Sequence, residues 1–576
     1  MGRLKRYIYP FRFFIALTLT IKLAGAVAEL FVPYFMERIL REGTMPGQQK
    51  RIYIYGALMI FCAGLCLLLN ITANRMSASS SGKITRKLRY DLFEKLNSLS
   101  ARQMDELTVP SAESRLTSDT YRVNEFLARG QRLGIRAPSL LIGGVIMMIT
   151  MDPGLALVPL SLLPIIALSV WMITRKSVPL YTREQSVLDD VVRVVQENVT
   201  GVRVVRALNK AAFERDRFTN VNDELTRVDV RAGSITALNN PIASLVLNLG
   251  LTAVVVVGAY RVSGGGTKPS VIVAFLQYFV MILNAMLGVT RIFIMASRST
   301  ASAHRVADVL DLPRDLEPMP AQERTDAADP VPHIEFRDVS FSYNGVGENI
   351  AHLSFRLFRG QTLGILGTTG SGKSTIIKLL MRSYDADSGE ILIDGKNIRS
   401  YEKDELSSLF GTVFQNDFVM EGTVSDNISF FRPLEKERIE TAARDAQAME
   451  FISGKEGGMD AAVAIRGSNL SGGQRQRLLI ARALAGDPDI LILDDASSAL
   501  DYRTDALLRH ALRANHSNTT TVLIAQRISS LRHADWILVL DDGKVIGAGK
   551  HEDLMEQCGE YRLIAETQMS AGEAGE

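Results

Sequence analysis

The stretch that decides the fold is Gly367-Thr368-Thr369-Gly370-Ser371-Gly372-Lys373-Ser374-Thr375. An apolar run over residues 362–366 precedes it and predicts a buried strand, and residues 376–381 after it predict a helix. The glycines let consecutive backbone N–H groups close on phosphate oxygens without Cβ clashes. Lys373 then reaches the β- and γ-phosphates, and the Ser374 hydroxyl binds Mg²⁺. A chance glycine-rich turn is the alternative, but the flanking strand and helix favour a phosphate-binding loop and therefore nucleotide binding.

Length and composition indicate two unlike halves. The chain has 576 residues, too many for one core, and long apolar runs stop near residue 297. A net charge of +2 argues against nucleic acid as the main partner. The three cysteines give neither a disulfide framework nor a metal-binding spacing, and no cleavable signal peptide is visible.

The first half is predicted to be an α-helical membrane domain. A spanning helix needs about 20 mostly apolar residues, and six stretches qualify. They are residues 14–35, 53–73, 133–150, 155–173, 235–260 and 270–294. An even number of spans places both ends of this domain on the same side of the membrane.

The long segments after the second and fourth spans are helical in pattern and rich in Arg and Lys. The positive-inside rule therefore places these helical extensions in the cytoplasm, where the nucleotide-binding half also finds its ATP. The basic and aromatic residues 4–14 predict an interfacial helix that leads into the first span.

Ionisable residues in the first span are candidates for a translocation path. Lys22 and Glu29 are seven residues apart and share a helix face. Buried charge in lipid is costly, so such residues face protein or a water-filled cavity. Pairing with each other or with a neighbouring helix is the structural alternative. Other residues that would suit an adaptable cavity are Asn239, Asn240, Asn248, Gln277, Met281, Asn284, Met286, Arg291 and Met295. Each of them taken singly is more often a helix–helix contact.

The second half is predicted to be an α/β nucleotide-binding domain. Residues 1–310 form the membrane domain, the proline-rich and acidic residues 311–332 form a linker, and residues 333–576 form the soluble domain. Two strands are expected at 334–336 and 339–343. Because a phosphate loop follows a strand in α/β folds, a largely parallel sheet surrounded by helices is expected.

Two further stretches complete a nucleotide site. The apolar strand 490–493 ends in Asp494 and Asp495, where Asp494 can hold Mg²⁺ opposite Ser374 and the next acidic residue can orient the attacking water. Between the two strands lies Leu470-Ser471-Gly472-Gly473-Gln474. Ser471 is placed to cap a helix whose N-terminus presents free N–H groups to an anion. A merely structural capped helix is the alternative.

The phosphate loop, the stretch 470–474 and the strand that ends in Asp494, behind six spans, resemble ATP-binding cassette (ABC) exporters over essentially the whole chain. Six spans fused ahead of one nucleotide-binding domain resemble a half-transporter. The resemblance implies a dimer in which each ATP lies between the phosphate loop of one subunit and segment 470–474 of the other. Residues 196–207 resemble the second cytoplasmic loop of such exporters, and residues 114–119 the region of the first coupling helix.

The resemblance also assigns roles to single residues. Tyr343 matches the aromatic residue that stacks on adenine, and Gln415 matches the glutamine that senses Mg²⁺ and the membrane domain. Asp501 ends the Ser-Ala-Leu-Asp stretch that communicates across the dimer.

Two positions depart from the family pattern. Asp495 stands where the family has a glutamate, and a carboxylate displaced by about 1 Å can cost on the order of a hundredfold in rate. Gln526 stands where the family has a histidine, and a neutral amide lacks the charge of an imidazolium. Both changes fall on the same ATP site while the phosphate loop stays intact. This pattern resembles the degenerate-site subunit of a heterodimeric multidrug-type exporter whose partner carries Glu and His.

The sequence-based interpretation is therefore ATP-driven export of an amphipathic small molecule, lipid or peptide across a bacterial inner membrane. A homodimeric exporter in which Asp495 is an adequate base is the main alternative. A channel or regulator that uses ATP only as a ligand is another. The six spans argue against a soluble ATPase of nucleic-acid maintenance.

Overall fold

The computed structural model describes residues 4–43, 49–313, 315–320 and 330–573. The chain forms two compact units, which are Met1–Asn97 with Thr108–Leu312, and Ser98–Leu107 with Pro313–Glu576. The second unit thus takes a short segment, Ser98–Leu107, from within the helical half of the sequence.

The first unit is helical. Its main helices are α1 (Lys5–Ile8), α2 (Arg12–Gly43), α3 (Gln49–Ser98), α5 (Val109–Ser114), α6 (Thr120–Met151), α7 (Pro153–Ala207), α8 (Ala211–Ala237), α9 (Asn239–Ser263) and α10 (Pro269–Leu310). Within the described residues, six helices are long and apolar enough to cross a membrane, which confirms the expected helical membrane domain.

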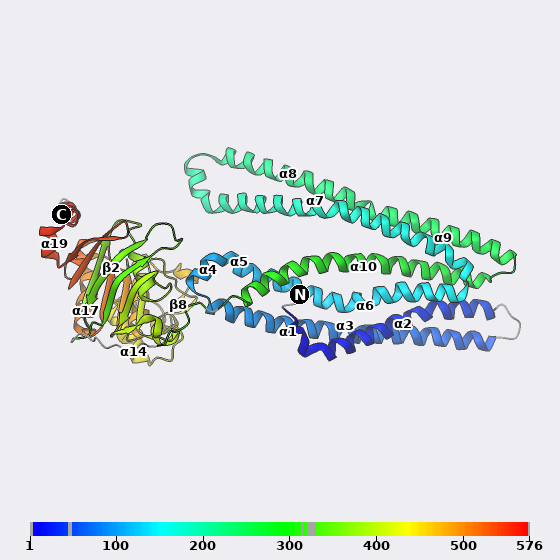
Figure 1. The fold of residues 1–576 in the computed structure, drawn as a ribbon, viewed down its shortest axis with the longest axis horizontal. Coiled ribbons are helices and arrows are strands. Elements are labelled where there is room, and N and C mark those ends of the chain that lie inside the picture. The colour runs from blue at the N-terminus through cyan, green and yellow to red at the C-terminus, as the bar shows by residue number, and fades with distance from the viewer. Residues whose placement is uncertain (1–3, 44–48, 314, 321–329, 574–576) are drawn as a thin grey trace. The chain divides into compact units, whose positions relative to one another are not determined.

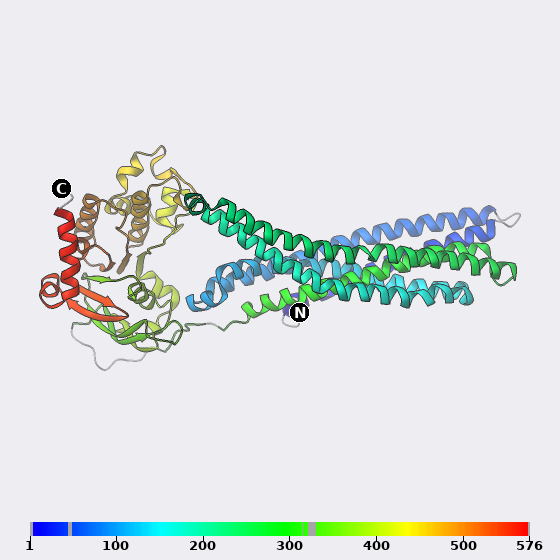
Figure 2. The ribbon, with the colours of Figure 1, turned by 90° about the horizontal axis from the view of Figure 1, so that it is seen from above.

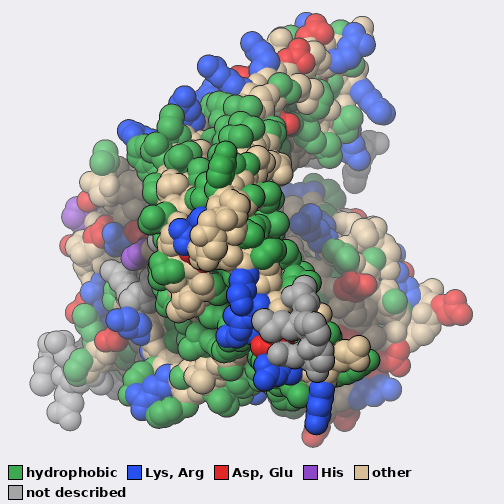
Figure 3. All heavy atoms as spheres, turned by 90° about the vertical axis from the view of Figure 1, so that its right-hand side faces the viewer, with side chains coloured by type: hydrophobic (Ala, Val, Ile, Leu, Met, Phe, Trp, Pro, Cys, Tyr) green, Lys and Arg blue, Asp and Glu red, His purple; other side chains and the backbone are tan. Residues whose placement is uncertain are grey.

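The apolar windows of these helices are only partly covered by protein. In the most apolar window of α3 no residue is buried within the unit, and Ile60, Leu67 and Leu68 are largely exposed. Viewed from the end at which α9 is joined to α10, hydrophobic side chains cover much of the visible surface (Figure 3). Apolar side chains in this arrangement suit contact with lipid.

The helices continue well beyond the apolar windows. Helices α7 and α8 run side by side as a long hairpin (Figures 1 and 2), which forms one of the predicted extensions. At the N-terminus, the interfacial helix expected over residues 4–14 is shorter than predicted. α1 covers only Lys5–Ile8, a 3₁₀ turn with Pro10 follows, and α2 begins at Arg12, because proline lacks the N–H that a continuous helix needs.

The second unit contains two main sheets. The six-stranded sheet has the order β12 (Lys544–Gly549), β11 (Trp536–Asp541), β3 (Thr362–Gly367), β10 (Thr520–Ile524), β9 (Ile490–Asp494) and β6 (Phe410–Val413). All neighbouring pairs are parallel except β11 with β12. The predicted largely parallel α/β core is therefore confirmed, and β3, β10 and β9 end at one edge of the sheet.

The second sheet is antiparallel, in the order β2 (Ile350–Leu357), β1 (Ile334–Phe341), β4 (Ser388–Ile393) and β5 (Lys396–Asn397). The two separate strands expected at 334–336 and 339–343 are one bulged strand, β1, whose register shifts near Asp338. Asp338 has a φ of 52°, so the chain kinks there without leaving the sheet.

Helices surround the sheets of the second unit. The longer ones are α11 (Lys373–Leu380), α14 (Lys436–Asp445), α16 (Gly472–Ala485), α17 (Tyr502–Asn515) and α20 (Gly559–Glu573). The shorter ones are α12 (Lys403–Ser408), α13 (Val424–Ser429), α15 (Met449–Ser453), α18 (Ile528–Leu531) and α19 (His551–Gln557).

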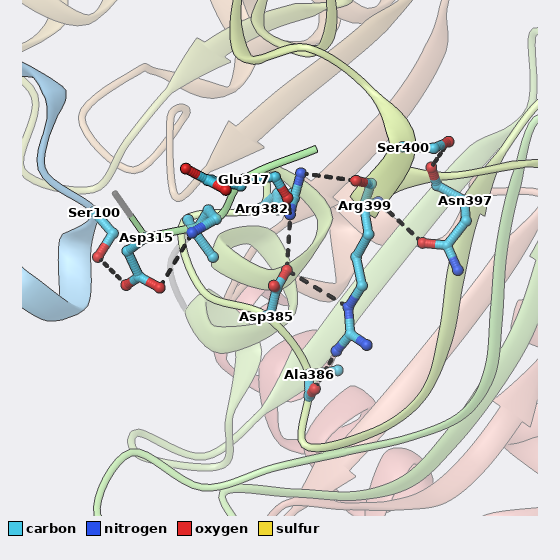
Figure 4. A network of polar contacts seen from close by, with 10 residues as sticks. Ser100, Asp315, Glu317, Arg382, Asp385, Ala386, Asn397, Arg399 and Ser400 are labelled. Carbon is cyan, nitrogen blue, oxygen red and sulfur yellow. Dashed lines mark hydrogen bonds and ion pairs between the residues drawn. The ribbon is translucent and has the colours of Figure 1, made fainter. Parts of the chain in front are cut away.

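A polar network fixes the start of the second unit (Figure 4). The Arg382 guanidinium donates to the carbonyl oxygens of Glu317 and Arg399, at 3.0 and 3.1 Å, and pairs with Asp385. The described part of the predicted linker is thus bound to the domain rather than free of it.

The same unit includes α4 (Ala101–Leu107), which follows Ser100. The Ser100 hydroxyl donates to Asp315, and Asp105 accepts a short hydrogen bond from the Tyr384 hydroxyl. Residues 114–119, which resemble the region of the first coupling helix, lie in the first unit, in α5 and the π-helical turn after it.

Candidate functional site

The phosphate loop lies between β3 and α11, as its flanking residues predict. The Lys373 ammonium crosses the loop and donates to the carbonyl oxygens of Gly367 and Thr368, at 2.9 and 2.6 Å. This bond pattern holds the loop in a closed curve around the lysine. The same ammonium is then next to the space that a triphosphate would fill.

Glycine is required at two points of the curve. Gly372 has a φ of 99°, and a Cβ there would lie 2.8 Å from the Asn349 carbonyl oxygen. A Cβ on Gly367 would lie 2.4 Å from the Leu540 carbonyl oxygen. Both positions therefore exclude larger residues for reasons of packing as well as of phosphate approach.

One buried polar atom of the loop has no protein partner. Among the described residues, the Ser371 hydroxyl is buried without a hydrogen bond. It stands just before α11, where the Thr375 N–H donates to the Gly372 carbonyl oxygen but the N–H groups of Lys373 and Ser374 have no backbone acceptor among the described residues. An anion in the loop would satisfy both kinds of donor.

Asp494 and Ser374 supply oxygen atoms at the adjoining strand end. The Ser374 hydroxyl donates to the Asp494 carboxylate at 3.1 Å. Two ligands on one edge of an octahedral Mg²⁺ ion lie about 2.9 Å apart, given its short metal–oxygen bonds. The pair therefore fits Mg²⁺, which would neutralise phosphate charge when bound with the nucleotide.

Burial shapes the electrostatics of the site. It lowers the pKa of the Lys373 ammonium, against the attraction of Asp494 and Asp495. It raises the pKa of the Asp494 carboxyl, although the Ser374 hydrogen bond opposes the shift, and it raises the pKa of Asp495, against Lys373 and Arg527. The three groups form one partly desolvated cluster, in which charge interacts more strongly than in water.

Hydrogen bonds fix the backbone of Asp495. Its φ is 53°, its N–H donates to the Ile524 carbonyl oxygen at 3.0 Å, and its carbonyl oxygen accepts from the Ser498 hydroxyl at 2.9 Å and from Gln476 at 3.4 Å. The α-carbon of Asp495 is therefore fixed to the neighbouring strand and to α16. The main chain therefore does not shift toward the nucleotide site to compensate for a side chain that is one methylene shorter than glutamate.

Gln526 reaches the same carboxylate. It follows β10, which lies between β3 and β9, so its side chain is at the strand edge that carries both other parts of the site. Its amide nitrogen lies 3.4 Å from the Asp495 carboxylate oxygen, within reach of a weak hydrogen bond. The two residues that depart from the family pattern thus contact each other.

Two glutamines of the site were missed by sequence reasoning. Gln476 lies within α16, two residues after the segment 470–474; its amide nitrogen donates to the Asp495 carbonyl oxygen and its amide oxygen accepts from the Ala499 N–H. Gln568 of α20 donates to the Gln526 carbonyl oxygen and accepts from the Ile528 N–H, both at 2.8 Å. No local motif marks Gln568, since its role depends on where α20 packs.

Tyr343 lies in an aromatic group beside the loop. Its ring packs edge-on against Phe341 and Tyr384, and its hydroxyl is 3.3 Å from the Thr375 hydroxyl. The Lys378 ammonium lies 5.2 Å from the ring centroid, a cation–π distance. Thr369 lies in the turn of the phosphate loop, between β3 and α11.

The segment 470–474 starts α16 as expected. The Ser471 hydroxyl accepts from the Gln474 N–H, and the Gln474 side chain accepts from the Ser471 N–H, which completes a capping box. Leu470 packs on the core. A Cβ on Gly473 would lie 3.0 Å from the Ala499 carbonyl oxygen, so packing also restricts this glycine. Among described residues, no hydrogen bond joins segment 470–474 to the phosphate loop.

Two further predicted residues lie near the site. Gln415 follows β6, the neighbour of β9, and is exposed at the same sheet edge. Asp501 caps α17: its carboxylate accepts from the Thr504 N–H and hydroxyl, which lowers the pKa of Asp501. The carboxylate of Asp501 therefore has a structural role in addition to any role in a dimer.

In the helical unit, Lys22 and Glu29 do not pair with each other. The Lys22 ammonium is buried and donates to Asn70 and Asn74 of α3, at 2.5 and 3.1 Å. Glu29 pairs with Arg136 of α6 at 2.8 Å. The pattern of charges in apolar spans identified Glu29 but not its partner. The side chains of Asn239, Asn240 and Arg291 lie outside the described residues.

A phosphate-binding loop in one unit, and in the other six helices long and apolar enough to cross a membrane, define a multi-pass membrane protein with a nucleotide-binding domain. Residues 15–286 match the family model of the ABC transporter transmembrane region, and residues 350–498 match the ABC transporter family model. The chain belongs to the ABC transporter family, as an exporter with a transmembrane domain fused to its nucleotide-binding domain.

Relatives of similar length support this assignment. An uncharacterized ABC transporter ATP-binding protein of Mycobacterium tuberculosis is 33% identical over 100% of this chain and 99% of its own. The ATP-dependent lipid A-core flippase of Idiomarina loihiensis is 31% identical over 99% of this chain and 97% of its own. A bacterial Atm1-family ABC exporter with ATP bound shares the fold, with a TM-score of 0.82 and 23% identity over 97% of this chain and 99% of that chain.

Proposed function

We propose that this chain exports an amphipathic small molecule, lipid or peptide across the cytoplasmic membrane as one half of a heterodimer. Its own phosphate loop binds Mg²⁺ and ATP but hydrolyses ATP slowly or not at all. Its intact segment 470–474 completes the competent site on a partner that carries Glu and His at the positions of Asp495 and Gln526. A relative named as a lipid A-core flippase supports amphipathic cargo.

The observation that carries this proposal is the pairing of the two altered residues. An attacking water must be oriented by a carboxylate at the right distance from the γ-phosphate. Both the N–H and the carbonyl oxygen of Asp495 are hydrogen-bonded, so its backbone is fixed. Because its side chain is one methylene shorter than glutamate, its carboxylate lies farther from the γ-phosphate. Gln526 donates toward that carboxylate and brings no positive charge to the phosphate.

Binding of ATP needs neither altered residue. The contacts of Lys373 with the loop carbonyls and of Ser374 with Asp494 support binding of triphosphate and Mg²⁺. A site that binds well and cleaves poorly can still hold two nucleotide-binding domains together. In the proposed cycle, ATP closes the domains and turns the membrane cavity outward, and hydrolysis at the partner's site resets it.

The homodimer is the second candidate, since Asp495 lies where a base is required and its pKa is raised by burial. Purification of the chain alone distinguishes the two. The heterodimer proposal predicts little ATPase activity without the partner. Brisk activity that Asp495→Asn abolishes would establish the homodimer. The neighbouring reading frame offers a second test, since it should encode a cassette protein with Glu and His at the two positions.

A further inference from the structure

A cavity in the helical unit joins a charged pair to apolar walls. It has a volume of about 590 Å³ and lies among α2, α6, α9 and α10. Its apolar lining includes Val32, Leu133, Leu140, Leu251, Leu276 and Val280. Its polar lining is Glu29, Arg136, Gln277 and Asn284. Cavities of this size, with few polar groups, are typical of small-molecule sites.

The Glu29–Arg136 pair leaves donors rather than acceptors for a ligand. Both oxygens of the Glu29 carboxylate accept from Arg136, through Nε at 3.2 Å and Nη2 at 2.8 and 3.1 Å. The Arg136 Nη1 group makes no hydrogen bond to any residue that the structure describes. The Arg136 side chain is 40% exposed, against 24% for Glu29. The pair therefore leaves guanidinium N–H groups of a cavity-lining arginine without a partner among the described residues.

Further cationic charge lies close by. Lys22 is seven residues before Glu29 on α2, about 10 Å along the helix, and its neighbours Asn70 and Asn74 are neutral. Because Glu29 is already neutralised by Arg136, the Lys22 charge adds a positive field at the cavity. An acceptor-rich, negatively charged group is the complement of this arrangement.

We propose that this cavity binds amphiphiles with an anionic headgroup, a carboxylate or a phosphate, on Arg136, with the acyl part against the apolar walls. This inference rests on the proposed export function, for which it names the cargo class. Glu29 orients the guanidinium, and Gln277 and Asn284 supply further polar groups along the cavity wall.

The test is equilibrium binding to the full-length chain, in the dimer in which it purifies, in nanodiscs without ATP. The probes are dodecanoate and dodecyl phosphate, with dodecyltrimethylammonium as the cationic counterpart. Partition into empty nanodiscs is subtracted. We expect both anions to bind at least about tenfold tighter than the cation, since one or two charge-assisted hydrogen bonds distinguish them.

Arg136→Gln should remove this preference, whereas Arg132→Gln should keep it. Arg132 is the matched control because it lies one turn away on α6, does not line the cavity and donates to the Ala128 carbonyl oxygen. If Arg136→Gln does not fold, Glu29→Gln takes its place. That variant frees the guanidinium and should keep or raise anion affinity.

Wild-type binding without preference for the anions would overturn the proposal, as would equal losses in the two arginine variants or an anion-affinity loss in Glu29→Gln. A difference between dodecanoate and dodecyl phosphate identifies the headgroup. The assay involves no hydrolysis, so its result is independent of whether the ATP site is degenerate.

Discussion

Replacing Asp495 by Glu together with Gln526 by His should restore hydrolysis at the phosphate loop of this chain. The Asp495 backbone is fixed by bonds to Ile524, Ser498 and Gln476, so the added methylene moves the carboxylate toward the nucleotide by about 1 Å. A displacement of that size is worth on the order of a hundredfold in rate, or about 2.7 kcal/mol of barrier. The histidine also replaces an amide that contacts the carboxylate.

The assay has to isolate this site, since a competent partner site would dominate steady-state turnover. We therefore place the double substitution in a dimer whose partner lacks its own catalytic glutamate, and follow single-turnover cleavage of bound ATP. We expect a rise of about a hundredfold over the same dimer with Asp495 and Gln526. Cleavage that is already fast before the substitution, or unchanged after it, would refute the reasoning.

Three other substitutions test separate parts of the structure. Lys373→Ala removes the ammonium that closes the phosphate loop, so binding of a non-hydrolysable ATP analogue to this site should weaken more than about tenfold. Gln568→Ala removes the acceptor for the Ile528 N–H and should speed hydrogen exchange at that amide; unchanged exchange would show that α20 does not hold the loop. Tyr384→Phe leaves the Asp105 carboxylate without this donor and should lower unfolding stability by about 1 kcal/mol, whereas an unchanged denaturation midpoint would contradict a role in holding α4.

The sequence was sufficient to predict those parts of the protein that depend on local pattern. The phosphate loop, the strand that ends in Asp494 and the cap at Ser471 are each specified by a few consecutive residues. The six apolar spans follow from length and hydropathy. Such features are predictable because backbone geometry and solvent transfer act on neighbouring residues.

Features that depend on distant residues were not predictable. Glu29 stood out as a charge in an apolar span, but its partner Arg136 is 107 residues away and lies on another helix. Gln568 contacts Gln526 across 42 residues, and no periodicity links the two. The bulge at Asp338 divided one strand into two apparent runs, since a kinked strand interrupts the alternation that marks it.

The central claim is that hydrolysis depends on segment 470–474 of this chain but not on Asp495. Steady-state ATPase activity of the assembled transporter tests it most directly, with Asp495→Asn compared with Gly473→Asp. The account predicts near wild-type activity for Asp495→Asn. It predicts loss of activity for Gly473→Asp, because a side chain there meets the Ala499 carbonyl oxygen and a carboxylate repels phosphate. Loss of activity in Asp495→Asn would contradict the account.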